Sequence, residues 1–319
     1  MGFGASPLVA ETSAALVQIA LLFPGQGSQF VGMGRELFES SAAARAVFEE
    51  ADAALGFPLS RLCFEGPEED LKRTANTQPA ILTHSVAALA ELRVGAPEKL
   101  EGAAFAAGHS LGEYSACVAA GALAFADAVR LVRRRGEFMQ EAVLPGVGAM
   151  AAIIGLSAED VEAACRESAD GEVVSAANFN SPEQTVIAGH AGAVERDSSA
   201  CLARGAKRAI PLAVSAPFHS PLMRPARERM AELLAATRFS DAAIPVVTNV
   251  DAAPVTEAER LEDSLVRQID SPVRWVESVR LLAREGVDHA VEIGPGNVLA
   301  GLVRRIERGI RVESWGRGE

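Results

Sequence analysis

The sequence predicts an α/β protein in which a parallel sheet, covered by helices on both faces, carries a smaller inserted α+β unit. The first observation is a set of continuous apolar runs that alternate with helical segments and end at turns or glycine-rich segments, at residues 18–23, 103–107, 244–248 and 289–294. Parallel strands are buried on both faces and need such uninterrupted apolar sequence. Functional loops in sheets of this kind collect at the carboxyl ends of the strands.

The second observation is a change of pattern in the middle of the chain. Strands are expected there at 148–154, 173–177, 185–189 and 208–214, with one helix after the first strand and another at 193–204. Ser157, followed three residues later by Asp160, has the spacing of a capping box and marks the start of the first of these helices. The order β-α-β-β-α-β is that of a split βαβ, ferredoxin-like module.

These patterns divide the chain of 319 residues into two domains, and its hydrophobic fraction of 49% is enough for a large core. The expected segments are a loose tail at 1–16, a large catalytic α/β domain formed by 17–143 and 214–319, and the inserted ferredoxin-like small domain at 144–213.

The composition excludes several functional classes. The net charge of −12 gives no global positive field, so a nucleic-acid partner is not expected. The four cysteines form no C-x-x-C pair, which fits reduced thiols in a cytoplasmic protein without a metal or redox motif. The apolar stretch at 14–23 has no basic flank and is broken by Gln18, so it predicts neither a signal peptide nor a membrane span.

The most informative motif is Gly108-His109-Ser110-Leu111-Gly112, which lies between the apolar run 103–107 and a helical segment at 113–120. A G-x-S-x-G motif between a strand and a helix is the context of a nucleophile elbow, in which the serine hydroxyl is exposed on a sharp turn. The glycines are needed because strand and helix approach too closely for a Cβ atom. The helix N-terminus then faces any oxyanion that forms beside Ser110. The alternative is a chance pentapeptide in a chain rich in alanine and glycine.

A serine nucleophile needs a base, and the chain has five histidines. His219 is the first candidate, because two prolines fix its loop where the chain leaves the inserted domain. His289, at the start of a buried strand, is second. His84 belongs to an apolar helical pattern, which favours a packing role. His109 adjoins Ser110, but neighbouring side chains are expected to point to opposite sides, which favours a structural role. His190 is expected on a turn.

Several motifs together resemble the malonyl-CoA:acyl carrier protein transacylase family, over about residues 18–310. In chain order they are Phe23-Pro24-Gly25-Gln26-Gly27-Ser28-Gln29, Gly108-His109-Ser110-Leu111-Gly112-Glu113-Tyr114, Arg135-Gly136-Glu137-Phe138-Met139-Gln140, Asn178-Phe179-Asn180-Ser181-Pro182, Pro217-Phe218-His219, Val266-Arg267-Gln268 and Glu292-Ile293-Gly294-Pro295-Gly296. The fold that this resemblance implies is a hydrolase-like α/β core with an inserted ferredoxin-like domain, which agrees with the order of elements described above.

The resemblance also implies roles for single residues. Ser110 matches the nucleophile and His219 the general base. Gln26 and Leu111 match the positions whose backbone N–H groups form the oxyanion hole. In this family a backbone carbonyl near the residue matching Gln268 orients the histidine, which would explain why no triad aspartate is evident.

Arg135 matches the residue that binds the free carboxylate of the malonyl group. A guanidinium pairs with a carboxylate bidentately, and a buried carboxylate without a partner is very costly. The alternative is that Arg135 lies on a solvated helix face, which is the interpretation we favour for Arg130, Arg133 and Arg134.

Three further residues complete the predicted substrate-binding set: Phe218, His109 and Asn180. In related polyketide acyltransferases a phenylalanine at the position of Phe218 goes with malonyl units and a smaller residue with methylmalonyl. A ring beside the acyl Cα would exclude a methyl branch, worth about 1–3 kcal/mol of discrimination. The alternative is a ring that only packs the loop.

The expected function is transfer of malonyl from malonyl-CoA to the phosphopantetheine thiol of an acyl carrier protein, by ping-pong covalent catalysis, in fatty-acid synthesis. No metal or redox cofactor is expected, nor a nucleic-acid or membrane partner, and the enzyme is expected to be a cytoplasmic monomer. Three alternatives stay open: a discrete malonyl acyltransferase of a polyketide synthase, an acyl hydrolase or thioesterase of the same fold, and a non-catalytic carrier-docking module.

Overall fold

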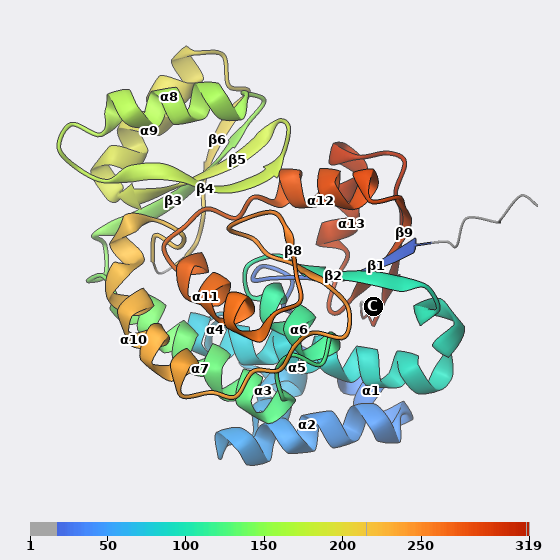
Figure 1. Cartoon of the computed structure of the whole chain (residues 1–319). Helices are drawn as coiled ribbons and strands as arrows, with labels where there is room; N and C mark the ends of the chain where they lie inside the picture. Colours follow the sequence, from blue (N-terminus) through green and yellow to red (C-terminus); the bar gives the residue numbers. More distant parts are fainter. Residues whose placement is uncertain (1–17, 215, 317, 319) are drawn as a thin grey trace, which may run out of the picture.

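The computed structural model describes residues 18–214, 216–316 and 318, so the expected tail at 1–16 lies outside the described residues. Its main sheet has six strands in the order β10-β9-β1-β2-β7-β8 (Figure 1). Neighbouring strands are parallel except for β7 and β8, which are antiparallel. The strands are β1 Gln18–Phe23, β2 Ala103–Gly108, β7 Val246–Val247, β8 Pro254–Val255, β9 Val287–Ile293 and β10 Arg311–Trp315.

Helices cover both faces of this sheet, and β1 shows why its sequence is apolar throughout (Figure 1). Its residues alternate between two hydrophobic clusters: Leu21 belongs to the cluster that includes side chains of α2, α5 and α7, and Leu22 to the cluster that includes side chains of α12 and α13. A strand buried in this way has no polar face. The helices on the first face are α2 Ala42–Leu55, α5 Thr74–Gly95 and α7 Phe125–Glu141, and those on the second are α12 Trp275–Arg284 and α13 Val298–Ile306.

The second sheet is antiparallel, with the strand order β4-β5-β3-β6. Helices α8 and α9 lie together on one of its faces and enclose a separate small core (Figure 1). The Ser157 hydroxyl accepts a hydrogen bond from the Asp160 backbone N–H, as the capping pattern predicts. The elements in chain order are β3 Gly148–Ile154, α8 Ala158–Ser168, β4 Val174–Ser181, β5 Gln184–His190, α9 Ala191–Ala203 and β6 Arg208–Pro211.

The predicted fold class is confirmed: a parallel core sheet is combined with a small antiparallel sheet in the order β-α-β-β-α-β. The exact domain boundaries stay a prediction. The other helices of the described residues are α1 Arg35–Ser40, α3 Leu59–Glu65, α4 Glu68–Leu71, α6 Gly112–Ala119, α10 Arg224–Ala235 and α11 Ala258–Gln268, with short 3-10 turns η1 Pro97–Leu100 and η2 Pro221–Met223. No helix in the described part of the chain is long and apolar enough to cross a membrane.

Two strand predictions extend beyond the residues that pair, and two strands, β8 and β10, were not predicted. The run 208–214 pairs only as far as Pro211, and Leu212 and Val214 instead line a cavity. In the run 244–248 only Val246–Val247 are paired. Strand β10 was not predicted, because its sequence Arg-Val-Glu-Ser-Trp has no apolar run; it is an edge strand that pairs on one side only, with β9.

Candidate active site

Ser110 lies on the sharp turn between β2 and α6, with a backbone φ of 51°. A Cβ atom on Gly108 would lie 2.0 Å from the Gly112 carbonyl carbon, and one on Gly112 would lie 2.0 Å from the Phe23 carbonyl oxygen. Both contacts are impossible for real side chains, so the turn requires glycine at each flank. The positive φ of a non-glycine residue is a strained conformation of the kind found at functional sites.

His219 reaches the serine from the loop that precedes η2, and it is also a non-glycine residue with positive φ, 58°. Its Nε2 lies 2.7 Å from the Ser110 Oγ, and its Nδ1 lies 2.8 Å from the backbone carbonyl oxygen of Gln268. A carbonyl only accepts hydrogen bonds, so Nδ1 carries the proton and Nε2 is free to accept one from the serine. Burial, reinforced by the nearby Arg135 charge, lowers the pKa of His219 to about 3, which keeps the ring neutral.

Two backbone N–H groups beside the serine are open. The Ser110 N–H donates to Asn249 Oδ1 over 2.7 Å, and the Gly112 N–H donates to the His109 carbonyl over 2.9 Å. Within the described residues, the N–H groups of Leu111 and Gln26 have no acceptor, and both residues line the same cavity as Ser110. Two backbone donors left free beside one serine hydroxyl are the kind of group that stabilises a negatively charged oxygen.

Arg135, on α7, has only 1% of its surface exposed, yet it has no acidic partner among the described residues. Its guanidinium is held by neutral groups: Nη1 donates to Gln78 Oε1 and Nη2 to Gln268 Oε1, both over 2.8 Å. Nη2 also lies 3.1 Å from the Ser110 Oγ, and the buried Nε has no partner. Burial lowers the Arg135 pKa. A buried cation without a counter-anion beside a nucleophile is suited to bind a carboxylate.

The neighbouring arginines of α7 behave differently. Arg130, Arg133 and Arg134 are more exposed, and each forms an ion pair within its own helix, with Asp127 or Glu137. These are ordinary surface pairs worth little individually. The sequence interpretation of these three as a solvated face therefore agrees with the structure.

The cavity beside Ser110 encloses about 120 Å³ and lies between the two sheets. The main-sheet side contributes Ser110 and Arg135, and the small sheet contributes Met150 and Asn178. Its full lining is Gln26, Gln78, His109, Ser110, Leu111, Arg135, Met139, Met150, Asn178, Leu212, Val214, Phe218 and His219.

The structure brings His109 to the same cavity as Ser110, with its ring centroid 5.7 Å from that of Trp275. The left-handed conformation of Ser110 turns the chain and breaks the alternation of an extended strand. His109 Nε2 lies 2.8 Å from Asn180 Oδ1, which links the elbow to β4. Phe218 is buried and lines the cavity, whereas Asn180 touches it only through His109.

Sequence reasoning missed several residues of this site. Asn249 holds the elbow, since its Nδ2 also donates to the Gly108 carbonyl over 2.7 Å. Glu113 is fully buried and accepts hydrogen bonds from the Asn249 N–H and from Gln268 Nε2. An acidic residue in the otherwise apolar segment 113–120 was the signal for Glu113, and a polar residue after the run 244–248 was the signal for Asn249. No comparable signal marks Gln78 within the apolar helix α5.

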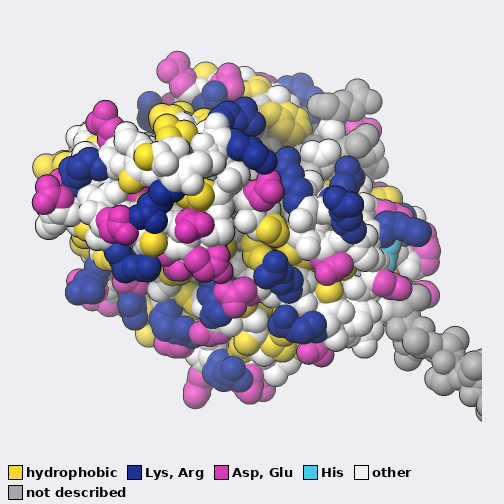
Figure 2. Space-filling model, turned by 90° about the horizontal axis from the view of Figure 1, so that it is seen from above, with side chains coloured by type: hydrophobic (Ala, Val, Ile, Leu, Met, Phe, Trp, Pro, Cys, Tyr) yellow, Lys and Arg dark blue, Asp and Glu magenta, His cyan; other side chains and the backbone are white. Residues whose placement is uncertain are grey.

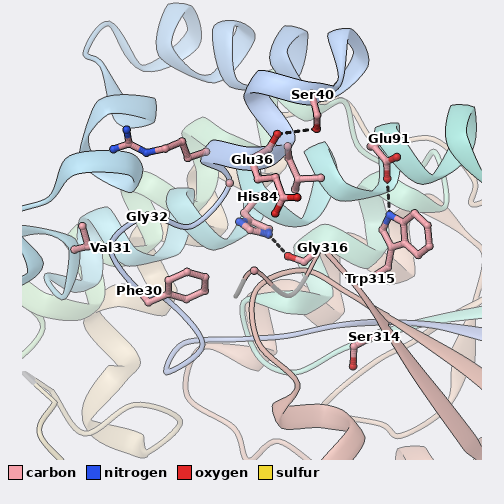
Figure 3. Close-up of a pocket in the computed structure, with 14 residues that line it drawn as sticks. Phe30, Val31, Gly32, Glu36, Ser40, His84, Glu91, Ser314, Trp315 and Gly316 are labelled. Carbon is pink, nitrogen blue, oxygen red and sulfur yellow. Dashed lines mark hydrogen bonds between the residues drawn. The ribbon is translucent and has the colours of Figure 1, made fainter.

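His84, on the buried helix α5, lies at a different cavity, between α1, α5 and the end of β10 (Figure 3). Its Nε2 is hydrogen-bonded to the Gly316 carbonyl, and burial lowers its pKa to about 4. The predicted packing role fits this position, because His84 ties α5 to the segment after β10.

The fold and the geometry together define an α/β enzyme built for a serine nucleophile, with a buried cation at the acyl pocket. The comparison with known families is specific: the sequence matches the acyl transferase domain family over residues 20–313, and the chain belongs to that family.

Relatives and solved structures agree with this assignment. The chain is 53% identical to the malonyl CoA-acyl carrier protein transacylase of Escherichia coli strain K12 over 291 residues, which cover 91% of this chain and 93% of that protein. The crystal structure of an acyl carrier protein S-malonyltransferase from Vibrio cholerae O1 biovar eltor superposes with a TM-score of 0.89 at 49% identity, over 93% of this chain and 96% of that one. A type II PKS malonyl-transacylase in complex with its acyl-carrier protein is 48% identical, with a TM-score of 0.89 and coverage of 93% and 95%.

Proposed function

We propose that this enzyme transfers the malonyl group from malonyl-CoA to the phosphopantetheine thiol of an acyl carrier protein. The observation that carries the proposal is the buried, unpaired Arg135 guanidinium, 3.1 Å from the Ser110 hydroxyl. An acyl group that ends in a carboxylate is the ligand that such a cation favours. The malonyl transferases named above support the same substrate.

The first half-reaction forms an acyl-enzyme. His219 Nε2 takes the Ser110 proton as the oxygen attacks the thioester carbonyl, and the resulting oxyanion is held by the N–H groups of Leu111 and Gln26. The tetrahedral intermediate collapses, the C–S bond breaks, and coenzyme A leaves as a thiol with the proton that His219 returns. The malonyl ester of Ser110 remains, with its free carboxylate on Arg135.

The second half-reaction reverses these steps with a different thiol. His219 takes the proton of the phosphopantetheine thiol, whose sulfur attacks the ester carbonyl. The ester bond between the acyl carbon and Ser110 Oγ then breaks, and His219 returns the proton to the serine oxygen. The carbonyl of Gln268 holds the imidazole in the same tautomer throughout, because its contact with Nδ1–H is not involved in either transfer.

Thioester exchange moves an acyl group and protons without any oxidation or reduction, and the residues named above supply the base and the oxyanion donors. We therefore propose that no metal or redox cofactor takes part. We also propose a cytoplasmic monomer that supplies extender units to fatty-acid synthesis. Service to a polyketide assembly line is the second candidate role, because one similar structure is a type II PKS transacylase bound to its carrier.

Two features argue against a hydrolase of long or uncharged acyl thioesters. The cavity of about 120 Å³ is small for a long acyl chain, given that one water occupies about 30 Å³ of liquid. A hydrolase of plain acyl groups also gains nothing from the buried Arg135 cation. A carrier-docking module without activity would need neither the Ser110–His219 contact nor an arginine beside it.

Intact-mass spectrometry tests the proposal directly. The wild-type protein mixed with malonyl-CoA is expected to gain one malonyl group, and addition of a phosphopantetheinylated carrier is expected to remove it to the carrier faster than water does. His219→Ala is expected to slow acylation by about 10²–10⁴-fold, because the general base is lost. Release of free malonate in preference to malonyl-carrier would instead identify a hydrolase, and absence of any adduct would contradict the proposal.

A further inference from the structure

The buried carboxyl group of Glu113 lies directly behind the active site and has no part in the reaction steps above. Its side chain is fully buried in α6, three residues after the nucleophile. Glu113 Oε2 accepts two hydrogen bonds, from Gln268 Nε2 over 2.8 Å and from the Asn249 backbone N–H over 3.0 Å. Glu113 Oε1 is buried and has no partner in the described residues. No cation forms an ion pair with this carboxyl there, so its charge is balanced only at a distance.

That balance comes from Arg135, through one intervening amide. Gln268 accepts from Arg135 with its Oε1 and donates to Glu113 with its Nε2, each over 2.8 Å. The amide has only one orientation that satisfies both contacts, since a guanidinium only donates and a carboxylate only accepts. The same residue donates to the Ser110 carbonyl and holds His219 with its own carbonyl. Guanidinium, amide and carboxyl therefore form one buried chain beneath the serine.

The other charged and titratable groups near Glu113 do not change this picture. Asp251, in the loop after β7, disfavours the charged carboxylate but is itself paired with Arg267. Tyr114 and Cys117, on the same helix, are neutral because burial raises the pKa of each. Burial raises the Glu113 pKa to about 7, while Arg135 and the two hydrogen bonds to Oε2 oppose that shift. Arg135 is thus the nearby cation whose charge favours the ionised carboxylate.

We infer that Glu113 is a positioning residue that serves as the counter-charge of Arg135 in the free enzyme and takes up one proton when the substrate carboxylate binds there. This inference rests on the proposed malonyl substrate. In the free site, Arg135 and the ionised Glu113 sum to zero charge. A malonyl carboxylate adds one negative charge to the same buried region, and burial of an unbalanced charge is costly.

One proton from solvent restores the balance. It binds Oε1, the oxygen that has no partner, so that Oε2 keeps both of its hydrogen bonds and Gln268 keeps its orientation. The arrangement selects for the acyl group as well, since an acetyl group brings no charge and leaves Glu113 as it was. A purely structural Glu113 would hold Gln268 equally well with either acyl group, and no proton would move.

The test counts protons during stoichiometric malonylation, with a pH indicator in weakly buffered solution and intact mass to count adducts. At about pH 8, above the free-enzyme pKa, the wild type is expected to take up close to one proton for each adduct, and at about pH 6 almost none. Glu113→Gln, which keeps an oxygen for both hydrogen bonds but has no charge, is expected to take up none. Its coenzyme A product ionises as it does with the wild type, so the difference between the two proteins cancels that contribution.

Glu292→Gln is the matched control, because Glu292 is another fully buried carboxyl whose pKa burial raises to about 7. Its hydrogen bonds are with the Leu299 and Ala300 N–H groups and not with Arg135 or Gln268. This variant is expected to take up the proton as the wild type does. A second readout is the ratio of malonyl to acetyl kcat/KM, which is expected to fall by up to about tenfold per pH unit above pH 7 in the wild type and to stay flat in Glu113→Gln.

The outcomes are distinguishable. Malonyl adducts with the same proton count at pH 6 and pH 8 in the wild type would overturn the inference and leave the proposed function standing. The same follows if Glu113→Gln takes up as many protons as the wild type. If the wild type forms no malonyl adduct, the proposed function itself fails. The wild-type comparison between the two pH values decides the question even if Glu113→Gln does not fold.

Discussion

Two strand-to-helix units at the carboxyl end of the main sheet differ in how the N-terminus of the helix is satisfied. In the unit formed by β9 and α13, Glu292 lies at the carboxyl end of the strand. Its two carboxyl oxygens accept hydrogen bonds from the Leu299 and Ala300 N–H groups over 2.9 and 2.8 Å. The N-terminus of α13 is therefore closed by an anion from the chain itself. In the unit formed by β2 and α6, the Leu111 N–H has no acceptor in the described residues, and Leu111 lines the cavity of Ser110.

The difference shows how one local motif serves either stability or chemistry. Helix N-termini favour acceptors such as carboxyl oxygens, and at α13 Glu292 of the chain itself occupies this position. At the elbow the anion is left to the substrate, and the backbone at Ser110 is held in a strained conformation by surrounding contacts such as that of Asn249. We therefore expect substitutions in the β2–α6 unit to change activity, and those in the β9–α13 unit to change stability.

The largest effect is expected in the β2–α6 unit, where the helix N-terminus is left without an acceptor among the described residues. Ser110→Ala removes the hydroxyl that we propose forms the acyl bond, so malonyl-enzyme formation is expected to disappear while the fold is retained. Intact mass after incubation with malonyl-CoA measures the adduct, and thermal unfolding checks the fold. A malonyl adduct on the Ser110→Ala protein would show that the nucleophile lies elsewhere.

Arg135→Ala removes the cation from the acyl pocket. The malonyl carboxylate would then be buried without a partner. The transition-state stabilisation of malonyl transfer, measured from kcat/KM, is expected to fall by about 2–5 kcal/mol. Acetyl-CoA has no carboxylate and is expected to lose little or to improve. The quantity to measure is the ratio of malonyl to acetyl transfer, because it cancels general damage to the fold. Equal decline of both substrates would assign Arg135 to structure and not to substrate recognition.

The stabilising role of the β9–α13 unit is tested through the pH dependence of the free energy of unfolding. Burial raises the pKa of Glu292 from 4.5 to about 7, so the folded protein binds this proton more tightly than the unfolded chain does. The resulting stability is fully present below pH 4.5 and is lost as the pH rises through 7. Replacement by glutamine is expected to remove this loss, on the order of 3 kcal/mol at about 1.4 kcal/mol per pKa unit.

Denaturant unfolding of wild type and Glu292→Gln between about pH 4 and pH 8 measures the difference. The malonyl transfer rate of the variant at each pH is the companion measurement, and it is expected to follow that of the wild type. A variant that lost transfer activity but kept the wild-type pH dependence of stability would reverse the roles assigned to the two units.

The smallest effect is expected at a group of basic residues at the C-terminal end of α13 and the start of β6, where we propose that the carrier docks. The candidate residues are Lys207, Arg208, Arg304 and Arg305. Arg305 reaches Gln184 over 3.4 Å and Lys207 pairs with Glu183 over 3.4 Å, so two of them meet at the turn between β4 and β5. Acidic and basic side chains are interspersed over the face shown in Figure 2, so docking is expected to depend on a local patch and not on net charge.

Charge reversal at Arg304 and Arg305 together is expected to raise the carrier KM several-fold, since an exposed charge pair is worth about 0.2–1 kcal/mol. Acylation by malonyl-CoA alone is expected to be unchanged. Arg61→Glu, at an exposed residue of α3, is the matched control for a change of surface charge. Loss of equal size in both half-reactions would place docking elsewhere.

The sequence was sufficient for the parts of the molecule that depend on local rules. Continuous apolar runs predicted β1 and β2, and the capping pair Ser157 and Asp160 predicted the start of α8. The elbow was predictable in part because Gly108 is required by a contact within the motif itself, with the backbone of Gly112, whereas Gly112 is required by its contact with Phe23 of the neighbouring strand. Weakly apolar or short elements such as β7 and β10 were missed or misjudged, since their pairing depends on neighbouring strands and not on their own composition.

The sequence by itself determined the fold class and the family and pointed to Ser110 as the candidate nucleophile, because each depends on residue types at short spacing or in ordered motifs. Only the tertiary structure decided which groups meet. Ser110, Arg135, His219 and Gln268 come from four separate segments, and their contacts of 2.7–3.1 Å exist because two sheets and α7 pack around one cavity. Burial, which is a property of the whole packed molecule, also decided that Arg135 has no directly bonded acidic partner in the described residues and that Glu113 lies beneath Ser110. No local sequence pattern shows how deeply a side chain is buried. The depth of burial sets the free-energy cost of these charges and therefore their need for a partner.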